Sequence, residues 1–207
     1  EAPAAEPSAP ETPAPAGEPR APEQLFTLEN DDAVFQLSSR GGTVVNVELK
    51  GYRATVERDS GPMVMDFRSA PALAVRGLPG MAQDGDLTAS PASDGRSVRF
   101  QRQLPSGLLF RRTLSLPEQG FVLQVSDEFI NTTTNVLFLP ALSVQTGPMR
   151  LPPGSTTMAG LPHLGADTLM SGADGVRHWS NQIGKWFNAA AKQAGGRQPP
   201  FLDRTIE

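Results

Sequence analysis

The segment GLLFRRTLSLPEQGFVLQVSDEFIN, residues 107–131, restricts the fold more than any other part of this chain. Apolar and polar residues alternate on both sides of the turn formers PEQG at 117–120, which is the period-2 pattern of two half-buried strands. Folding the chain so that Leu116 faces Phe121 aligns the two apolar faces, and a slip by one residue would turn one face to solvent. The sequence therefore predicts a β-hairpin. The pairs in this register are Leu114 with Leu123, Phe110 with Asp127, and Leu108 with Phe129.

Two charged residues, Arg112 and Asp127, fall on the apolar face of this hairpin. The predicted register places Arg112 opposite Val125 and diagonal to Asp127. One interpretation is a cross-strand ion pair at the edge of the sheet or within a groove. The more ordinary alternative is that the face is only partly covered there and that both charges reach water.

Most of the remaining chain also reads as short strands separated by turn formers. In residues 41–52, Val45, Val47 and Leu49 alternate with polar residues. They follow Gly41-Gly42, which predicts a turn that requires positive φ. The sequence thus predicts an all-β, mainly antiparallel fold. Further strands are expected at 25–30, 33–39, 61–67, 71–77 and, with a proline interruption typical of an edge strand or bulge, 136–147. A loop is expected at 78–95, and a long loop with short strands at 148–175.

Residues 179–194 break the strand pattern. Their larger apolar residues recur with the spacing of one helical stripe, and Gly195-Gly196 follows as a stop signal. We therefore expect a C-terminal amphipathic helix that packs its stripe against the sheet. The alternative use of the aromatic residues is a sugar-stacking platform or a peptide-binding groove. The residues of this candidate platform are Tyr52, Trp179, Trp186 and Phe187.

The first 23 residues differ in composition from the rest. They contain seven prolines, seven alanines, five glutamates and one arginine, without a large apolar side chain. This composition predicts a disordered, partly extended spacer, and residues 24–207 are expected to form a single domain. The spacer accounts for the whole formal net charge of −4, so the domain is neutral on balance. A neutral domain argues against nucleic acid as a partner.

The sequence offers no recognisable catalytic or cofactor-binding constellation. It has no cysteine, and His163 and His178 lack an Asp or Glu at ligand-like spacing. Nucleophile-elbow, phosphate-loop and dinucleotide motifs are absent, and no apolar run approaches the ~20 residues that span a bilayer. We therefore expect a domain that is not an enzyme, with no catalytic residues, metal site or cofactor.

Three blocks, in order, resemble a known family. Residues 25–52, LFTLENDDAVFQLSSRGGTVVNVELKGY, are similar to the opening of the large periplasmic domain of bacterial YidC-type membrane protein insertases. Residues 98–133 resemble that family's central run of strands. The stretch WSNQIGKWF at 179–187 is similar to the helix that precedes its membrane-embedded core. The chain departs from better-known members in being shorter between Ser60 and Gly95 and in its Pro/Gly-rich 148–175 region.

The resemblance implies a β-supersandwich, mutarotase-like in shape. It also implies a transmembrane helix before residue 1 and the insertase core after residue 207, which would anchor the domain at the periplasmic face of the bacterial inner membrane. The implied function is non-catalytic assistance to the insertion and folding of inner-membrane proteins. The implied partners are accessory proteins of the Sec translocon, nascent membrane polypeptide, or both. No partner-binding residues are carried over from the family.

The sequence nominates five residues as partner or groove contacts and leaves two rival functions open. The nominated partner or groove contacts are Arg112, Asp127, Trp179, Trp186 and Phe187. One rival is a carbohydrate-binding or mutarotase-like module, which would bring a histidine and a carboxylate together in a concave pocket. The other is a structural surface domain carried on the Pro-Ala spacer.

Overall fold

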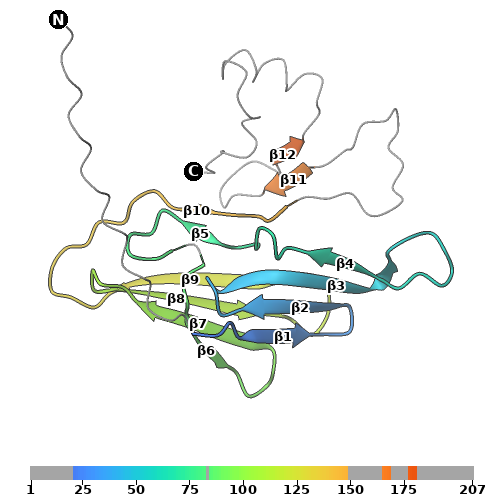
Figure 1. Cartoon of the computed structure of the whole chain (residues 1–207), viewed down its shortest axis with the longest axis horizontal. Coiled ribbons are helices and arrows are strands. Elements are labelled where there is room, and N and C mark those ends of the chain that lie inside the picture. The colour runs from blue at the N-terminus through green and yellow to red at the C-terminus, as the bar shows by residue number, and fades with distance from the viewer. Residues whose placement is uncertain (1–20, 83, 149–164, 169–176, 181–207) are drawn as a thin grey trace, which may run out of the picture.

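Two four-stranded antiparallel sheets make up most of the structure, a computed structural model that describes residues 21–82, 84–148, 165–168 and 177–180. Each sheet is a meander in which strands consecutive in the sequence pair with one another (Figure 1). The first sheet contains β1 (Leu25–Glu29), β2 (Ala33–Ser38), β3 (Thr43–Arg53) and β4 (Pro62–Asp66). The second contains β6 (Thr88–Pro91), β7 (Ser97–Gln103), β8 (Leu108–Ser115) and β9 (Gln124–Asn131).

Two small two-stranded sheets complete the described strands. β5 (Val75–Arg76) pairs with β10 (Ser143–Val144), and β11 (Gly165–Thr168) pairs with β12 (Arg177–Ser180), both antiparallel. No α-helix occurs within the described ranges, and hence none there is long and apolar enough to cross a bilayer. The expected all-β, antiparallel fold class is confirmed.

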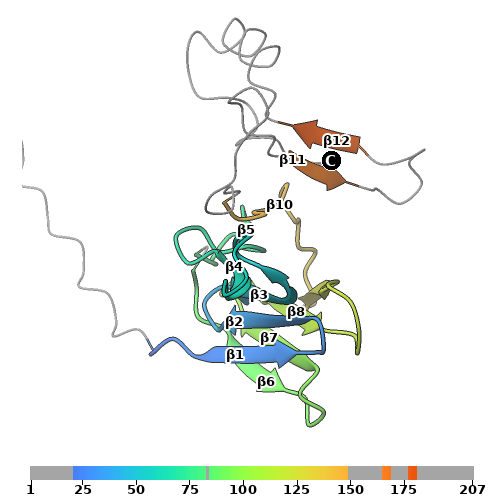
Figure 2. The same cartoon turned by 90° about the vertical axis from the view of Figure 1, so that its right-hand side faces the viewer.

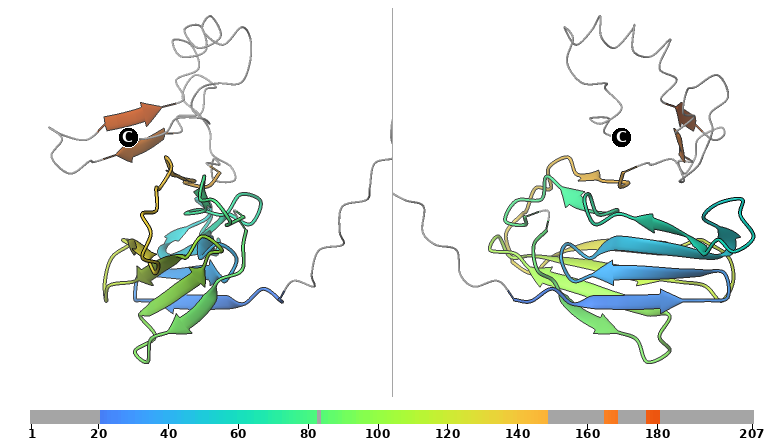
Figure 3. Two further views of the ribbon diagram at one scale, coloured as in Figure 1. Left: turned by 90° about the vertical axis from the view of Figure 1, so that its left-hand side faces the viewer. Right: turned by 45° about the vertical axis from the view of Figure 1, so that its right-hand side comes forward.

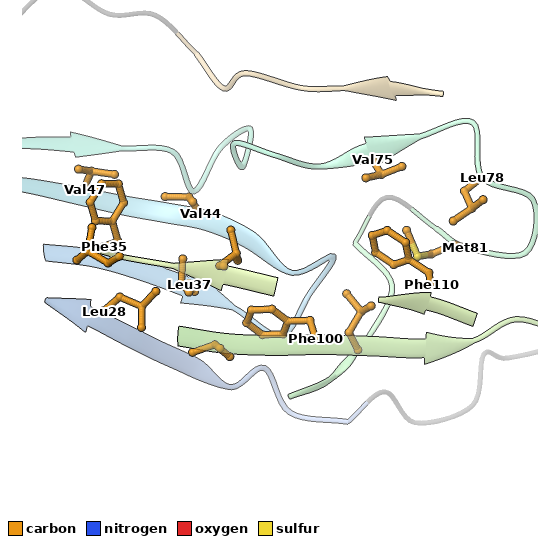
Figure 4. Close-up of a cluster of buried hydrophobic side chains, with 14 of the residues drawn as sticks. Leu28, Phe35, Leu37, Val44, Val47, Val75, Leu78, Met81, Phe100 and Phe110 are labelled. Carbon is orange, nitrogen blue, oxygen red and sulfur yellow. The ribbon is translucent and has the colours of Figure 1, made fainter. Parts of the chain in front are cut away.

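The two large sheets stack face to face (Figures 2 and 3). The buried side chains of the core lie between them. In β8 every second residue is buried, and in β2 Ala33, Phe35 and Leu37 are buried in the same alternation. Phe26 of the first sheet meets Phe100 of the second edge to face, with ring centroids 5.6 Å apart. Burying each large apolar side chain stabilises the fold by about 1.5–3 kcal/mol. The core between the sheets therefore holds the two meanders together (Figure 4).

A β-bulge in β3 changes which residues of this strand face the core. The pairing with β2 runs from Phe35 opposite Val47 to Leu37 opposite Val44, which leaves Val45 as the extra residue. An extra residue reverses the facing of the side chains beyond it. Val44 and Val47 therefore both join the core. The predicted single face of Val45, Val47 and Leu49 was wrong for Val45, which lines a cavity outside the core.

The predicted hairpin of residues 107–131 forms, but its register was wrong by two residues. Phe110 lies opposite Phe129, and Arg112 lies directly opposite Asp127. The connection between β8 and β9 is longer than the predicted four-residue turn because it binds the β1–β2 turn. Asn30 Nδ2 donates hydrogen bonds of 2.9 Å to the carbonyl oxygens of Pro117 and Gly120. These contacts, 87 and 90 residues apart in sequence, lie beyond the reach of a hairpin rule.

Other expectations were met in part. The predicted loop at 78–95 contains β6, which is docked by Leu87, whose N–H donates to the Ser39 carbonyl at 2.9 Å. The expected strands at 71–77 and 136–147 shorten to the two-residue β5 and β10. The expected helix at 179–194 lies outside the described residues, except that positions 179 and 180 belong to β12. The expected spacer is likewise outside them up to residue 20.

The predicted positive-φ turn at Gly41-Gly42 is confirmed. The φ angles are +68° and +59°, which place both residues in the left-handed region that L side chains rarely adopt. A Cβ atom at Gly42 would approach Phe100 Cβ to 3.3 Å and Arg112 Cδ to 3.4 Å. Glycine at position 42 is therefore required by the backbone conformation and also by the close approach of the second sheet.

The variant Asn30→Ala tests the link between the β1–β2 turn and the β8–β9 connection. Asn30 is buried, and its Oδ1 accepts hydrogen bonds from the N–H groups of Asp32 and Ala33. Its loss leaves polar groups unpaired on both segments, so we expect urea unfolding to show a loss of about 2–4 kcal/mol in the free energy of unfolding. The control is Asn131→Ala, an exposed asparagine with comparable local bonds, for which we expect less than about 1 kcal/mol. Equal losses would contradict this linkage.

A second comparison, Gly42→Ala against Gly95→Ala, separates backbone strain from close packing. Gly95 has φ +67°, but a Cβ there would meet nothing within 4 Å. Both variants carry the cost of a non-glycine residue at positive φ, and only Gly42→Ala adds a clash with the second sheet. We expect thermal or urea unfolding to show an additional loss of about 1–3 kcal/mol for Gly42→Ala. Similar losses in the free energy of unfolding for the two variants would mean that the second sheet does not pack closely against the turn at Gly42.

Candidate functional site

The side chain of Arg112 lies inside the sandwich, on the core-facing side of β8. Its side chain is 0% exposed, and its neighbours on the same face of the strand are Phe110 and Leu114. Burying a guanidinium among apolar side chains is costly unless its N–H groups are paired. The alternative that Arg112 reaches water was therefore wrong, and the cross-strand ion pair was the correct interpretation.

Asp127 of β9 supplies the counter-charge through a two-pronged contact. Arg112 Nε donates to Asp127 Oδ1 at 2.7 Å, and Arg112 Nη2 donates to Asp127 Oδ2 at 2.6 Å. The side chain of Asp127 is 22% exposed, so the carboxylate lies at the rim of the sandwich. A bidentate arginine–carboxylate pair fixes orientation as well as charge. The pair therefore locks β9 onto β8 at one register.

The remaining nitrogen of Arg112 connects three parts of the chain. Nη1 donates to the Gly42 carbonyl at 3.2 Å and also to the Leu73 carbonyl. Leu73 has φ +69° and is, among the described residues, the one non-glycine residue at positive φ. Its own N–H donates to the Gln145 carbonyl at 2.7 Å. Arg112 thus joins the second sheet to the β2–β3 turn and to the segment before β5.

An aromatic pair lies beside this ion pair. The Arg112 guanidinium carbon lies 5.6 Å from the centroid of the Phe110 ring, and the Phe110 and Phe129 rings are 5.4 Å apart. A guanidinium over an aromatic face is favoured electrostatically. Phe110, with Phe129 packed against it, therefore lies beside the ion pair.

A second arginine–carboxylate pair lies on the opposite face of the same two strands. Arg111 lies opposite Glu128, with 3.3 Å between Nη1 and Oε2. These side chains are 29% and 50% exposed. An exposed pair of this kind contributes about 0–1 kcal/mol. The two carboxylates at the middle of β9 are therefore each matched by an arginine of β8.

This arrangement is suited to holding a strand in place and not to acid–base chemistry. Both oxygens of Asp127 are bound by the guanidinium, and an arginine does not release a proton at physiological pH. Across the described part of the chain, no cluster of three metal-ligating residues occurs. Arg112, nominated as a contact residue, is enclosed and acts here by orienting Asp127. A partner contact at Asp127 stays a prediction.

An exposed apolar rim adjoins the start of β9. Phe121, Val122 and Val125 are 43%, 66% and 40% exposed. Tyr52, at the far end of β3, meets Phe121 edge to face at 5.5 Å and is itself 56% exposed. Of the nominated aromatic platform, Tyr52 is thus on the surface with Phe121, a partner that sequence reasoning did not identify. Position 179 lies in β12, and Trp186 and Phe187 lie outside the described residues.

A cavity of about 440 Å³ lies on the other side of the first sheet and was not foreseen from the sequence. The bulged residue Val45 lines it, together with Thr43 and the segment before β5. Both signs of charge line the wall. Its lining residues are Glu23, Leu25, Ser38, Arg40, Thr43, Val45, Arg68, Pro71, Ala74 and Asp84. The histidine–carboxylate pocket of the carbohydrate rival stays a prediction, because the side chains of both histidines lie outside what the structure describes.

The variant Asp127→Asn tests whether the buried pair holds β9. It leaves the Arg112 guanidinium enclosed without its counter-charge, so we expect urea unfolding to show a loss of about 3 kcal/mol in the free energy of unfolding. The matched control is Glu128→Gln, the next residue on the same strand, for which we expect less than about 1 kcal/mol. The interpretation would be contradicted if both variants lost the same amount.

A comparison of the sequence with known protein families covers both large sheets. A family model described as the YidC periplasmic domain matches residues 25–166. No curated protein matches the chain. The family match starts at the first residue of β1 and ends within β11, and hence includes both four-stranded sheets and the Arg112–Asp127 pair. The chain therefore belongs to the YidC periplasmic domain family.

Proposed function

We propose that this domain is a non-catalytic accessory part of a YidC-type insertase, at the periplasmic face of the bacterial inner membrane. It assists the insertion and folding of inner-membrane proteins by contacting other polypeptides. The partners are accessory proteins of the Sec translocon or the nascent membrane polypeptide itself. The observation that supports this most directly is the family match across both sheets.

Two features of the described residues suit a contact function. The apolar rim of Tyr52, Phe121, Val122 and Val125 leaves side chains on the surface that another polypeptide can cover. Beside it, the Arg112–Asp127 pair fixes the position of β9. A rigidly held strand next to exposed apolar side chains is a pre-organised contact surface, since little ordering is required on binding.

Site-specific photo-crosslinking in the insertase that carries this domain tests the proposal. A photoreactive residue placed at Val125 or Ser126 is expected to form adducts with a Sec accessory protein or a nascent membrane polypeptide, because both positions are exposed on β9. The control position is Ser93, which is exposed in the turn between β6 and β7, at the opposite edge of the same sheet. Adducts at Val125 and Ser126 no stronger than at Ser93 would overturn the proposed contact.

A further inference from the structure

β9 is the longest edge strand of the two large sheets, and neither a proline nor a bulge blocks it. It pairs with β8 over all eight residues and lies at the end of the strand order. It contains no proline and its pairing has no bulge, whereas β4 begins with Pro62 and β6 ends with Pro91. Edge strands are commonly blocked by prolines, bulges, short length or charged side chains. Of these β9 carries only the charges of Asp127 and Glu128, and each is paired with an arginine of β8. After β9 the chain turns away to pair with β5 through β10 (Figure 1).

The hydrogen-bond pattern shows which backbone groups of β9 are open. The N–H of Thr132 donates to the Gly107 carbonyl, and this pair continues the β8–β9 register. In antiparallel pairs, hydrogen-bonded residues alternate with residues whose N–H and C=O point to the other side. The outward groups are therefore those of Val125, Asp127, Phe129 and Asn131. None of these backbone groups is bonded to another segment within the described residues.

A row of alternating donors and acceptors is complemented only by another extended backbone. Adding a strand to a sheet edge in this way is an established mode of peptide recognition. The side chains beside the row are half-exposed Val125 and partly buried Phe129, with Val122 next to them. An added strand with β-branched apolar residues at alternate positions would cover them. The central carboxylates require no counter-charge, since each is already paired with an arginine.

We propose that β9 accepts an extended polypeptide segment, with apolar residues at alternate positions, as an additional strand of the second sheet. This inference rests on the proposed polypeptide contact and specifies its mode. Because the hydrogen bonds are made by the backbone, β9 would accept many different sequences, provided that the segment is extended and has apolar residues at alternate positions. That tolerance suits a domain that meets chains of differing sequence.

A second copy of this chain fits the edge less well. If two β9 strands paired through their outward residues, the registers nearest to full overlap would place Asp127 opposite its own copy or Glu128 opposite its own copy. Like charges directly opposite one another destabilise a strand pair. The carboxylates thus favour a different polypeptide over self-association.

The test uses a labelled eight-residue peptide with valines alternating with threonines and a lysine at each end, added to the full 207-residue chain. We expect saturable binding in fluorescence anisotropy and slowed amide exchange at Val125, Asp127 and Phe129. Val125→Pro removes one outward N–H and leaves the bonds to β8 intact, and is expected to weaken binding about tenfold. The matched control, Val64→Pro, removes an N–H that points outward from the edge strand β4 and is expected to leave binding unchanged.

Two further samples keep the test independent of folding defects. Val125→Thr keeps the N–H and the branched shape and is expected to bind as the native chain does. A peptide with N-methylated valines, which cannot donate their backbone hydrogens, is expected to lose binding to the unmodified protein. Equal binding of the methylated peptide, slowed exchange on another strand, or a peptide-independent dimer formed through β9 would each overturn strand addition.

The outcomes also separate this inference from the proposed function. If crosslinks to polypeptide form at Val125 and Ser126, and the crosslink at Ser126 persists in Val125→Pro, the domain contacts chains through side chains and strand addition is wrong. If peptide binding requires the β9 amides but no crosslinks form in the insertase, the edge is competent for strand addition and the proposed function is wrong.

Discussion

The guanidinium of Arg112 is the group around which the two sheets are arranged. A cation enclosed between sheets is tolerated only when its N–H groups are paired, and Arg112 donates four hydrogen bonds to other segments. Two are to the Asp127 carboxylate, and two are to the Gly42 and Leu73 carbonyls. Both of these carbonyls belong to residues at positive φ, at +59° and +69°. The unusual backbone at these two positions thus occurs where carbonyl oxygens accept hydrogen bonds from the buried guanidinium.

The same interaction accounts for how β9 is held. Most of its residues are at least partly exposed, so apolar burial contributes less to its position than to that of β8. Paired with Arg112 on one face and Arg111 on the other, its two central carboxylates fix the strand against β8. These two ion pairs involve side chains only. The side-chain pairs that fix β9 therefore leave its outward N–H and C=O groups unpaired within the described residues.

Local patterns in the sequence were sufficient for the strands and the tight turn but not for their long-range relations. The alternation in β8 and the double glycine at 41–42 are properties of neighbouring residues, and both predictions are confirmed. The register of the 107–131 hairpin was wrong by two residues because Asn30 holds the connection open from the first sheet. The bulge at Val45 was not predicted because Val44 and Val45 are both apolar, so the sequence does not show which of them faces the core. The burial of Arg112 likewise depends on carbonyls 70 and 39 residues away.

The contrast between Arg111 and Arg112 shows what the sequence of β8 leaves undetermined. The two residues are adjacent, have the same side chain and pair with adjacent acids on β9, yet one is part of the surface and the other is part of the core. Successive residues of a strand point to opposite faces of the sheet, so Arg111 and Arg112 lie on opposite faces of β8. Only the packing of the first sheet decides which of these faces is enclosed. If the first sheet covered the opposite face of β8 and β9, Glu128 would lie at the rim of the sandwich and the Arg112–Asp127 pair would lie in water. The surface that β9 presents to another chain is therefore set by the position of the first sheet, through the turn at Gly42 that contacts Arg112.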